Sequence, residues 1–137
     1  MARGRDAAGR PVPAGSPEAV EQPPEQALPP AKALALARDL TARGRPFYAH
    51  DVLEARWKVA PAAERDLWQG LAQVCVGLTH LQRGNPVGGA RLLRRGADRL
   101  AGYGGAAYGV DVAGVARQAR RRAAEVEAGR PGEAVVL

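Results

Sequence analysis

Two side chains that can transfer a proton or bind a metal, His50 and Glu54, stand four residues apart in the stretch FYAHDVLEARWK. Side chains at this spacing project from the same side of an α-helix, one turn apart. Phe47 and Trp57 flank the pair, each three residues away, so two aromatic rings share its helical face. Because rings of this size are usually buried, the imidazole and the carboxylate are predicted to face the interior.

A second group of polar side chains lies in the following uncharged stretch, where Gln69, Gln73 and His80 fall within about 40° of one another on a helical wheel. This polar stripe is opposite to a stripe of leucines, so the two stripes face different neighbours. A short connection makes the two helical segments antiparallel neighbours. Trp57 is then expected near the start of the second segment and His50 near its end, toward His80.

Three interpretations follow for these two polar faces. A buried carboxylate and imidazole are costly unless they are hydrogen-bonded, paired or bound to a cation. The favoured interpretation is a structural hydrogen-bond network, in which His50 orients Glu54 and the glutamines bond to backbone or solvent. The second is a ligand pocket, or a zinc, iron or manganese site with His50, Glu54 and His80 as ligands and an open position for water. The third is that the two faces do not meet.

Other reactive residues in the sequence have simpler explanations. Asp51 lies about 100° from His50 around the helix, which directs it toward solvent or a cap. Cys75 stands in an apolar run and, as the only cysteine, cannot form an internal disulfide, so it is predicted to be a small buried side chain. The glycine-rich stretch GYGGAAYG follows a helix instead of a strand and is predicted to be a connector, not a phosphate-binding loop. No Ser/His/Asp or Cys/His arrangement points to nucleophilic catalysis.

These side chains must be positioned by helices, because the sequence is rich in alanine and leucine, contains no isoleucine and shows no strand-like alternation. Proline in the first turn and glycine after the last turn punctuate the chain. Asn85 and Asp111 are suitable N-caps for the last two segments. The punctuation predicts five helices, over residues 31–43, 46–58, 62–83, 87–102 and 112–128.

The third of these segments is predicted to be the centre of the fold. It bears an apolar stripe with spacings of four and three residues, and no charged residue occurs between Asp66 and Arg83. A helix that is apolar on nearly all sides is surrounded by others. The stripe consists of Leu67, Leu71, Val74, Leu78 and Leu81. The expected fold class is therefore all-α: a single helical bundle of about five helices with one central buried helix.

The two ends of the chain are predicted to lie outside the bundle. Residues 1–30 contain most of the eleven prolines and few large apolar side chains, so they cannot bury enough surface to offset the entropy of ordering. They are predicted to be a disordered Pro-rich tail. Residues 31–128 are predicted to be the helical bundle domain, and residues 129–137 a frayed C-terminal tail.

Length, charge and hydropathy exclude several classes of protein. At 137 residues the chain has the length of one domain and can bury a core without disulfides or a structural metal. The N-terminal sequence MARGRDAAGR lacks the apolar stretch of a secretory signal, and residues 67–82, the longest uncharged segment, are too few and too polar to cross a bilayer. The protein is therefore predicted to be cytoplasmic, with no membrane association. Its net charge of +6 arises outside the first 30 residues and permits an acidic partner without requiring one.

Two stretches resemble a known family. FYAHDVLEARWK and the later LWQGLAQVCVGLTHLQRGNPVGGARLLRRGADRL are similar, in this order, to the family called domain of unknown function 309 (DUF309), and the likeness extends over about residues 36–122. Members usually carry Glu where this chain has Asp51. The resemblance implies a compact helical bundle with one central helix and brings no established activity. The motif positions that it carries over are His50, Asp51, Glu54, Trp57, Gln69, Gly70, Gln73 and His80.

Three functions are compatible with these features. The favoured one is a small cytoplasmic binding or scaffold domain, monomeric or homo-oligomeric, whose His/Glu/Gln cluster is structural. The second is a metal-dependent enzyme of the hydrolase type, in which His50, Glu54 and His80 hold a divalent metal ion and its water. The third is a nucleic-acid-binding module that uses the arginines of the last two helices, although a solvated basic face is the usual explanation of such arginines.

Overall fold

The computed structural model describes residues 4–13, 15–24 and 26–137, and its core consists of helices. The five α-helices are α1 (Pro30–Ala42), α2 (Pro46–Val59), α3 (Arg65–Gln82), α4 (Pro86–Ala101) and α5 (Val112–Glu127). A 3-10 turn, η1 (Ala62–Glu64), replaces the first turn of the predicted third helix. The predicted all-α fold class is confirmed. Among the described helices, none combines the length and the apolar character that crossing a bilayer requires.

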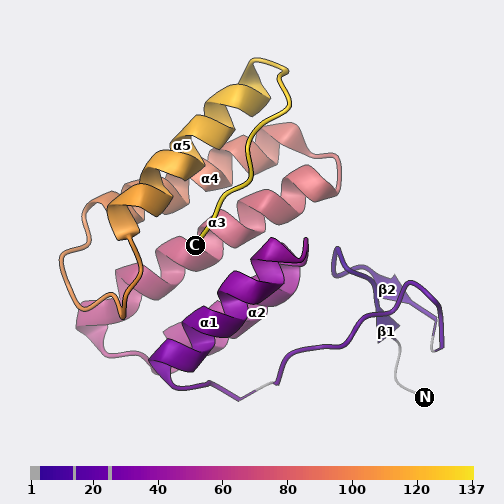
Figure 1. Ribbon diagram of the computed structural model, residues 1–137, viewed down its shortest axis with the longest axis horizontal. Coiled ribbons are helices and arrows are strands. Elements are labelled where there is room, and N and C mark those ends of the chain that lie inside the picture. The colour runs from indigo at the N-terminus through magenta and orange to yellow at the C-terminus, as the bar shows by residue number, and fades with distance from the viewer. Residues whose placement is uncertain (1–3, 14, 25) are drawn as a thin grey trace.

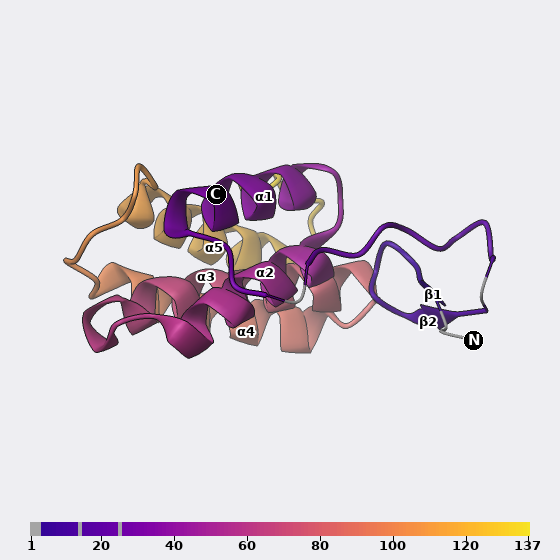
Figure 2. The ribbon, with the colours of Figure 1, turned by 90° about the horizontal axis from the view of Figure 1, so that it is seen from below.

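The helices are arranged in two layers, and consecutive helices run antiparallel (Figure 1). Figure 2 shows α2, α3 and α4 in one layer, with α1 and α5 covering it from one side. α3 occupies the middle of its layer and packs most extensively against α4 and then against α2. Leu67, Trp68, Leu71 and Val74 of α3 are fully buried. α3 is therefore the central helix, as its sequence predicts.

The ends of the helices follow the predicted punctuation. The Asn85 side chain accepts a hydrogen bond from the backbone nitrogen of Gly88 at 3.1 Å and caps α4. Asp111 caps α5 in the same way, through the backbone nitrogen of Gly114 at 3.0 Å. Gly84, which follows α3, has a φ of 80° that only glycine adopts without strain. The tight turn that results brings α4 back along α3.

Four glycines let α3 and α4 approach each other closely. Gly70 and Gly77 of α3 face Gly96 and Gly89 of α4, respectively. A Cβ atom at Gly96 would lie 2.8 Å from the carbonyl oxygen of Gly70 and 2.9 Å from the backbone nitrogen of Val74. A Cβ atom at Gly77 would lie 3.0 Å from the carbonyl oxygen of Gly89. The two helix backbones therefore touch where side chains would normally separate them.

Residues 4–13, 15–24 and 26–29 have a defined conformation, whereas the sequence predicts a disordered tail over residues 1–30. Within the described part of this tail, β1 (Gly4–Arg5) and β2 (Pro11–Val12) form a small antiparallel ribbon. The turn of the ribbon docks on the start of α2, where Gly9 lies directly against the Phe47 ring. A side chain at this glycine would overlap the ring carbons. The packed structure therefore includes residues whose low hydropathy predicts exposure to solvent.

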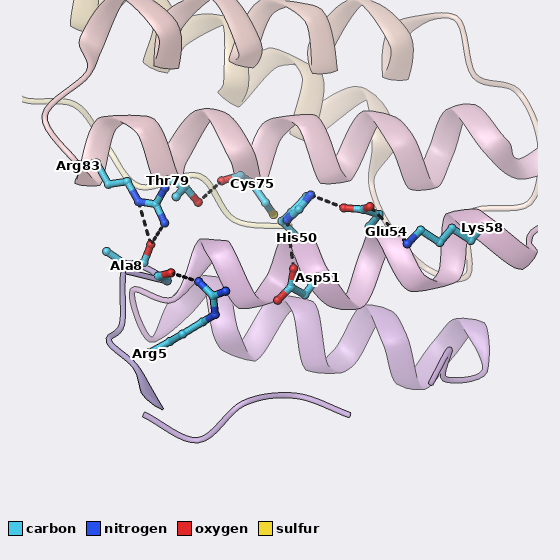
Figure 3. Close-up of polar contacts among 10 residues, drawn as sticks. Arg5, Ala8, His50, Asp51, Glu54, Lys58, Cys75, Thr79 and Arg83 are labelled. Carbon is cyan, nitrogen blue, oxygen red and sulfur yellow. Dashed lines mark hydrogen bonds and ion pairs between the residues drawn. The ribbon is translucent and has the colours of Figure 1, made fainter. Parts of the chain in front are cut away.

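The attachment of this ribbon also uses hydrogen bonds to its backbone oxygens. The Tyr48 hydroxyl donates a hydrogen bond to the carbonyl oxygen of Asp6 at 2.7 Å. The Arg83 guanidinium donates to the carbonyl oxygen of Ala8 through Nε at 3.0 Å and through Nη2 at 2.6 Å (Figure 3). Hydrogen bonds to backbone oxygens cannot be inferred from a hydropathy pattern, so the sequence predicts disorder for this segment.

The segment after α5, which the sequence predicts to be frayed, also packs on the bundle. It crosses between α5 and α1, and Val135 and Leu137 are buried (Figure 1). The Gln118 side chain donates to the carbonyl oxygen of Val136 at 3.0 Å and accepts from its backbone nitrogen at 2.8 Å. Arg38 Nε of α1 donates to a Leu137 oxygen at 3.0 Å. The apolar residues near the C-terminus thus fill the space between the two helices of the covering layer.

Candidate functional site

A pocket of about 180 Å³ opens between α2 and α3, which lie side by side. It is lined by His50, Glu54 and Trp57 of α2 and by Gln69, Ala72, Gln73 and Val76 of α3. Five of the six side chains assigned to the candidate polar pocket from the sequence therefore line one cavity, which is called the α2–α3 pocket below. The two polar faces do meet, because the antiparallel hairpin places the start of α3 beside the end of α2.

His50 and Glu54 form an ion-pair-type contact at this pocket. His50 Nε2 lies 2.7 Å from Glu54 Oε2, and Lys58 Nζ approaches the other carboxylate oxygen at 3.6 Å (Figure 3). The His50 side chain is 22% exposed and that of Glu54 is 40% exposed. The pair thus lies at the opening of the pocket. The expectation that it is buried in the interior is wrong for Glu54, because α2 and α3 form one layer and nothing covers this carboxylate completely.

Two nitrogen atoms of pocket-lining side chains are buried without a hydrogen-bond partner among the described residues: His50 Nδ1 and Trp57 Nε1. Asp51 Oδ1 lies 3.5 Å from His50 Nδ1, and the Asp51 side chain is 45% exposed on the side of α2 away from α3 (Figure 3). This position agrees with the prediction that Asp51 faces solvent. The Arg65 guanidinium covers the Trp57 ring at 5.3 Å from its centroid but does not engage the indole nitrogen.

The two glutamines form the polar side of the pocket on α3. Gln73 Oε1 accepts a hydrogen bond from Arg99 Nε of α4 at 3.3 Å. Arg99 in turn is anchored by Asp66, whose Oδ1 lies 2.9 Å from Arg99 Nη1. Asp66 and Arg99 thus hold the Gln73 side chain in place at the wall of the pocket. Gln69 lies one turn before Gln73 on the same face.

His80 is separated from the α2–α3 pocket, contrary to the prediction. It shares the angular position of the glutamines, but it follows Gln73 by seven residues, which corresponds to about 10 Å along the helix axis. Its Nδ1 lies 2.8 Å from Asn85 Nδ2, and Asn85 caps α4 through its other side-chain atom. His80 therefore orients the residue that starts α4.

The three-ligand metal site inferred from the sequence is not formed. In the part of the chain that the structure describes, no group of three or more His, Cys, Asp or Glu side chains could hold a metal ion. His50 and Glu54 are close to each other, but His80 bonds to Asn85 instead. The predicted zinc, iron or manganese site with His50, Glu54 and His80 is therefore wrong, because a shared helical face does not imply a shared height along the helix.

Glu54 also borders a second cavity, on the side of α2 that faces the N-terminal segment. This cavity, of about 270 Å³, is lined by Gln22, Pro23 and Pro24 together with α2 residues that include Glu54 and Lys58. The segment predicted to be a free tail thus passes next to the candidate site.

The family comparison agrees with the resemblance of the sequence. The model of DUF309, a domain of unknown function, matches residues 34–92. The chain is thus similar to DUF309 over this part of its length. The match is narrower than the likeness over residues 36–122 expected from the motifs, and it leaves out α5. No curated protein and no solved structure matches the chain.

The segment that matches the DUF309 model contains the whole candidate site. It runs from Leu34 in α1 through α2 and α3 into the first half of α4, so all seven residues of the α2–α3 pocket lie within it. The N-terminal ribbon and the C-terminal segment lie outside it. The family description assigns no activity, so the function must be argued from the site.

Sequence reasoning did not find every residue that shapes the α2–α3 pocket. Ala72 and Val76 form its apolar part, but both look like ordinary core residues of an apolar helix. Arg99, which orients Gln73, belongs to a different helix and lies 26 residues away in the sequence. Phe47 flanks His50 as expected, with 6.0 Å between the ring centroids, but its other contact, with the N-terminal ribbon, was not expected. Only the packing of the helices shows which of these residues line the pocket.

Cys75 is predicted to be unreactive in the folded protein. It is fully buried in α3, and burial raises the pKa of its thiol to about 12. Since the thiolate is the nucleophile, the thiol remains protonated and inert at mildly alkaline pH. We expect dithionitrobenzoate to label the folded protein very slowly and to label one thiol per chain once urea unfolds it. Rapid labelling of the folded protein would contradict this placement of the thiol.

Proposed function

We propose that this protein is a small-molecule-binding protein and that its binding site is the α2–α3 pocket. Its apolar part, formed by Ala72, Val76 and the Trp57 ring, and its few converging polar groups are typical of ligand sites. The His50–Glu54 contact and the Gln73–Arg99 bond hold those polar groups in place. The proposal develops the binding-domain hypothesis and assigns the polar cluster a role in recognition.

The observation that carries the proposal is the convergence of five polar or aromatic side chains from two helices on one cavity of about 180 Å³: His50, Glu54, Trp57, Gln69 and Gln73. Polar groups that partners within the protein already hold in place are preorganised for a ligand, because little side-chain entropy remains to be lost on binding.

Catalysis has less support than binding. The His50–Glu54 contact could move a proton, but the seven pocket-lining side chains that the structure describes include no Ser, Thr, Cys or Lys to act as a nucleophile. The contact is better suited to hold Glu54 as a hydrogen-bond acceptor for a ligand.

Nucleic-acid binding also has less support, because four of the eight arginines of α4 and α5 form ion pairs with carboxylates of the described residues. Arg94 forms an ion pair with Glu127, and Arg120 lies 3.0 Å from a carboxylate oxygen of Asp98. These ion pairs link α4 to α5 and reduce the positive charge available to phosphates.

The two tryptophans provide a direct test. In ¹H–¹⁵N spectra the protein has two indole N–H signals, and Trp68 serves as the internal reference because its Nε1 already donates to Glu64 at 3.3 Å. We expect at least one of three small probes, benzamide, benzoate or benzamidine, to shift the Trp57 signal saturably and to leave the Trp68 signal in place. If none of the three produces a saturable shift, the proposed function is wrong.

A pocket-filling variant supplies the control. Val76→Phe places a ring in the α2–α3 pocket, so the saturable shift of the Trp57 signal should disappear. Val59→Phe makes the same change at a side chain that is 60% exposed, outside the pocket, and binding should persist. Equal loss in both variants would contradict the assignment of the binding site.

A further inference from the structure

The N-terminal segment approaches both members of the His50–Glu54 pair at the α2–α3 pocket. On the side of His50, the ribbon packs on Phe47, and the centroid of the Phe47 ring lies 6.0 Å from that of the imidazole. On the side of Glu54, residues 22–24 line the cavity of about 270 Å³ that this carboxylate borders. The pair therefore has neighbours that belong to the N-terminal segment as well as to the helices.

The ribbon holds the Phe47 ring through two contacts. Gly9 lies directly against the ring, and the Arg5 guanidinium lies 5.7 Å from the ring centroid. Arg5 Nη1 also donates a hydrogen bond to the carbonyl oxygen of Gly9 at 2.8 Å, so the two contacts are linked. On the side of the bundle, the Arg83 guanidinium lies 5.2 Å from the same centroid. A ring with these neighbours has little rotamer freedom, and His50 therefore packs next to a fixed group.

The stretch beside Glu54 is attached to the bundle through the same ribbon. The backbone nitrogen of Val20 donates a hydrogen bond to the carbonyl oxygen of Arg5 at 2.8 Å. A Cβ atom at Gly4 would lie 2.9 Å from the Cβ atom of Ala19, so residues 19 and 20 pack closely on the first strand of the ribbon. Residues 22–24 follow directly. Release of the ribbon would therefore remove an anchor of the stretch that borders Glu54.

The ribbon can detach while the bundle remains folded. Each of its two strands has only two residues, and a two-stranded hairpin alone is at best marginally stable in water. Its order depends on the contact between Gly9 and Phe47 and on the hydrogen bonds that Tyr48 and Arg83 donate to its backbone. Parts of a protein that are held by so few contacts open locally. Docked and released forms of the ribbon thus differ little in free energy.

We propose that the N-terminal ribbon is a strap that regulates ligand binding at the α2–α3 pocket. When the ribbon is docked, Phe47 and His50 are held in place, and the pocket is preorganised for its ligand. When the ribbon is released, these side chains must be ordered as the ligand binds, so the affinity falls. This inference rests on the proposed function and names the regulation of the same site.

Gly9→Val tests the proposal, because a Cβ atom at this glycine would lie 2.3 Å from two carbons of the Phe47 ring. Gly15→Val is the matched control: Gly15 has a φ of 77°, close to the 81° of Gly9, but a Cβ atom there has no heavy atom within 4 Å. The two variants carry a similar backbone strain, and only Gly9→Val adds a clash. The backbone amide signals of Asp6 and Val20, which both donate within this segment, should move to unfolded-peptide positions in Gly9→Val only. Docked signals that persist in Gly9→Val would overturn the proposal.

Titration of both variants with benzamide, benzoate and benzamidine, followed by the Trp57 indole signal, then measures the effect on the pocket. Each probe that binds the unsubstituted protein should bind about fivefold more weakly to Gly9→Val, as expected when one or two side chains must be ordered on binding, and equally well to Gly15→Val. Equal or higher affinity in Gly9→Val, with the ribbon released, would overturn the regulation and leave binding at the pocket intact. Absence of binding by all three probes to the unsubstituted protein would overturn the proposed function as well. The Trp68 indole signal reports that the bundle is folded.

A double-mutant cycle assigns the coupling to Phe47. Phe47→Leu removes the ring that lies between the ribbon and His50, so Gly9→Val should cause little further loss of affinity when it is added to Phe47→Leu. A further loss of about fivefold in this background would contradict the transmission through Phe47 that the proposal requires.

Discussion

Replacing Gly96 by alanine is expected to lower the free energy of unfolding by about 2 kcal/mol, within the range for overpacked interiors. The new Cβ atom would lie 2.8 Å from the carbonyl oxygen of Gly70 and 2.9 Å from the backbone nitrogen of Val74. These are backbone atoms of α3, so they cannot rotate away as the end of a side chain can. Helix propensity acts in the opposite direction, since alanine favours a helix over glycine by about 1 kcal/mol. Urea denaturation followed by circular dichroism measures the net change.

The control for this prediction is a glycine-to-alanine substitution at a position where the new Cβ atom meets no other heavy atom. Gly102 follows α4, has a φ of −87°, and would place a Cβ atom with no heavy atom within 4 Å. Gly102→Ala should therefore leave the stability unchanged or slightly increased. Gly77→Ala, at the second close contact between α3 and α4, should resemble Gly96→Ala. Equal stability of all three variants would show that the two helices do not approach as closely as described.

Replacing Trp68 by alanine is expected to have the largest effect of any single change proposed for this chain, about 3–5 kcal/mol, as is usual for a large aromatic side chain removed from a core. Trp68 is fully buried in α3. Its indole nitrogen donates to Glu64, the Tyr108 ring lies 6.1 Å from its ring, and the Arg56 guanidinium covers it at 5.8 Å. The substitution thus leaves a cavity next to the connection between α2 and α3 and removes the support of the α4–α5 loop. Thermal and urea denaturation measure the loss.

An exposed apolar side chain provides the comparison for this second prediction. Val87 at the start of α4 is 77% exposed, so Val87→Ala should change the stability by no more than about 0.5 kcal/mol. A Trp68→Ala protein as stable as Val87→Ala would be incompatible with a fully buried indole. Because Trp68 is outside the α2–α3 pocket, a milder substitution such as Trp68→Phe should retain probe binding while it lowers stability.

We propose that the polar cluster combines two roles that the sequence presented as alternatives. The His50–Glu54 contact and the Gln73–Arg99 bond are satisfied within the protein, as a structural network requires. The same contacts hold these side chains at the wall of the α2–α3 pocket, so little side-chain entropy remains to be lost when a ligand binds.

Much of this arrangement follows from the sequence by itself. Proline and glycine punctuation set the five helices to within a few residues, because these signals depend on local backbone geometry. The spacing of His50, Glu54 and Trp57 put them on one face of α2, and the short connection after α2 made α3 its antiparallel neighbour. Each of these inferences uses only the periodicity of the helix and the length of a loop, and both are local properties of the chain.

Other features were decided only by the tertiary structure. His80 and Gln73 share a face of α3 but lie at different positions along the helix axis. The placement of α2 along α3 therefore decides that His80 contacts Asn85 instead of lining the pocket. The close approach of α3 and α4 at their glycines depends on which backbone faces each glycine, and a glycine in a helical pattern does not reveal its neighbour. Tyr48, Arg83 and Gln118 hold the N-terminal ribbon and the C-terminal segment through hydrogen bonds to backbone oxygens. Every residue has a backbone oxygen, so the sequence does not reveal which of them will be bound. The physical reason is the same in each case: these contacts join residues far apart in the chain, and their partners are fixed only when the helices have packed.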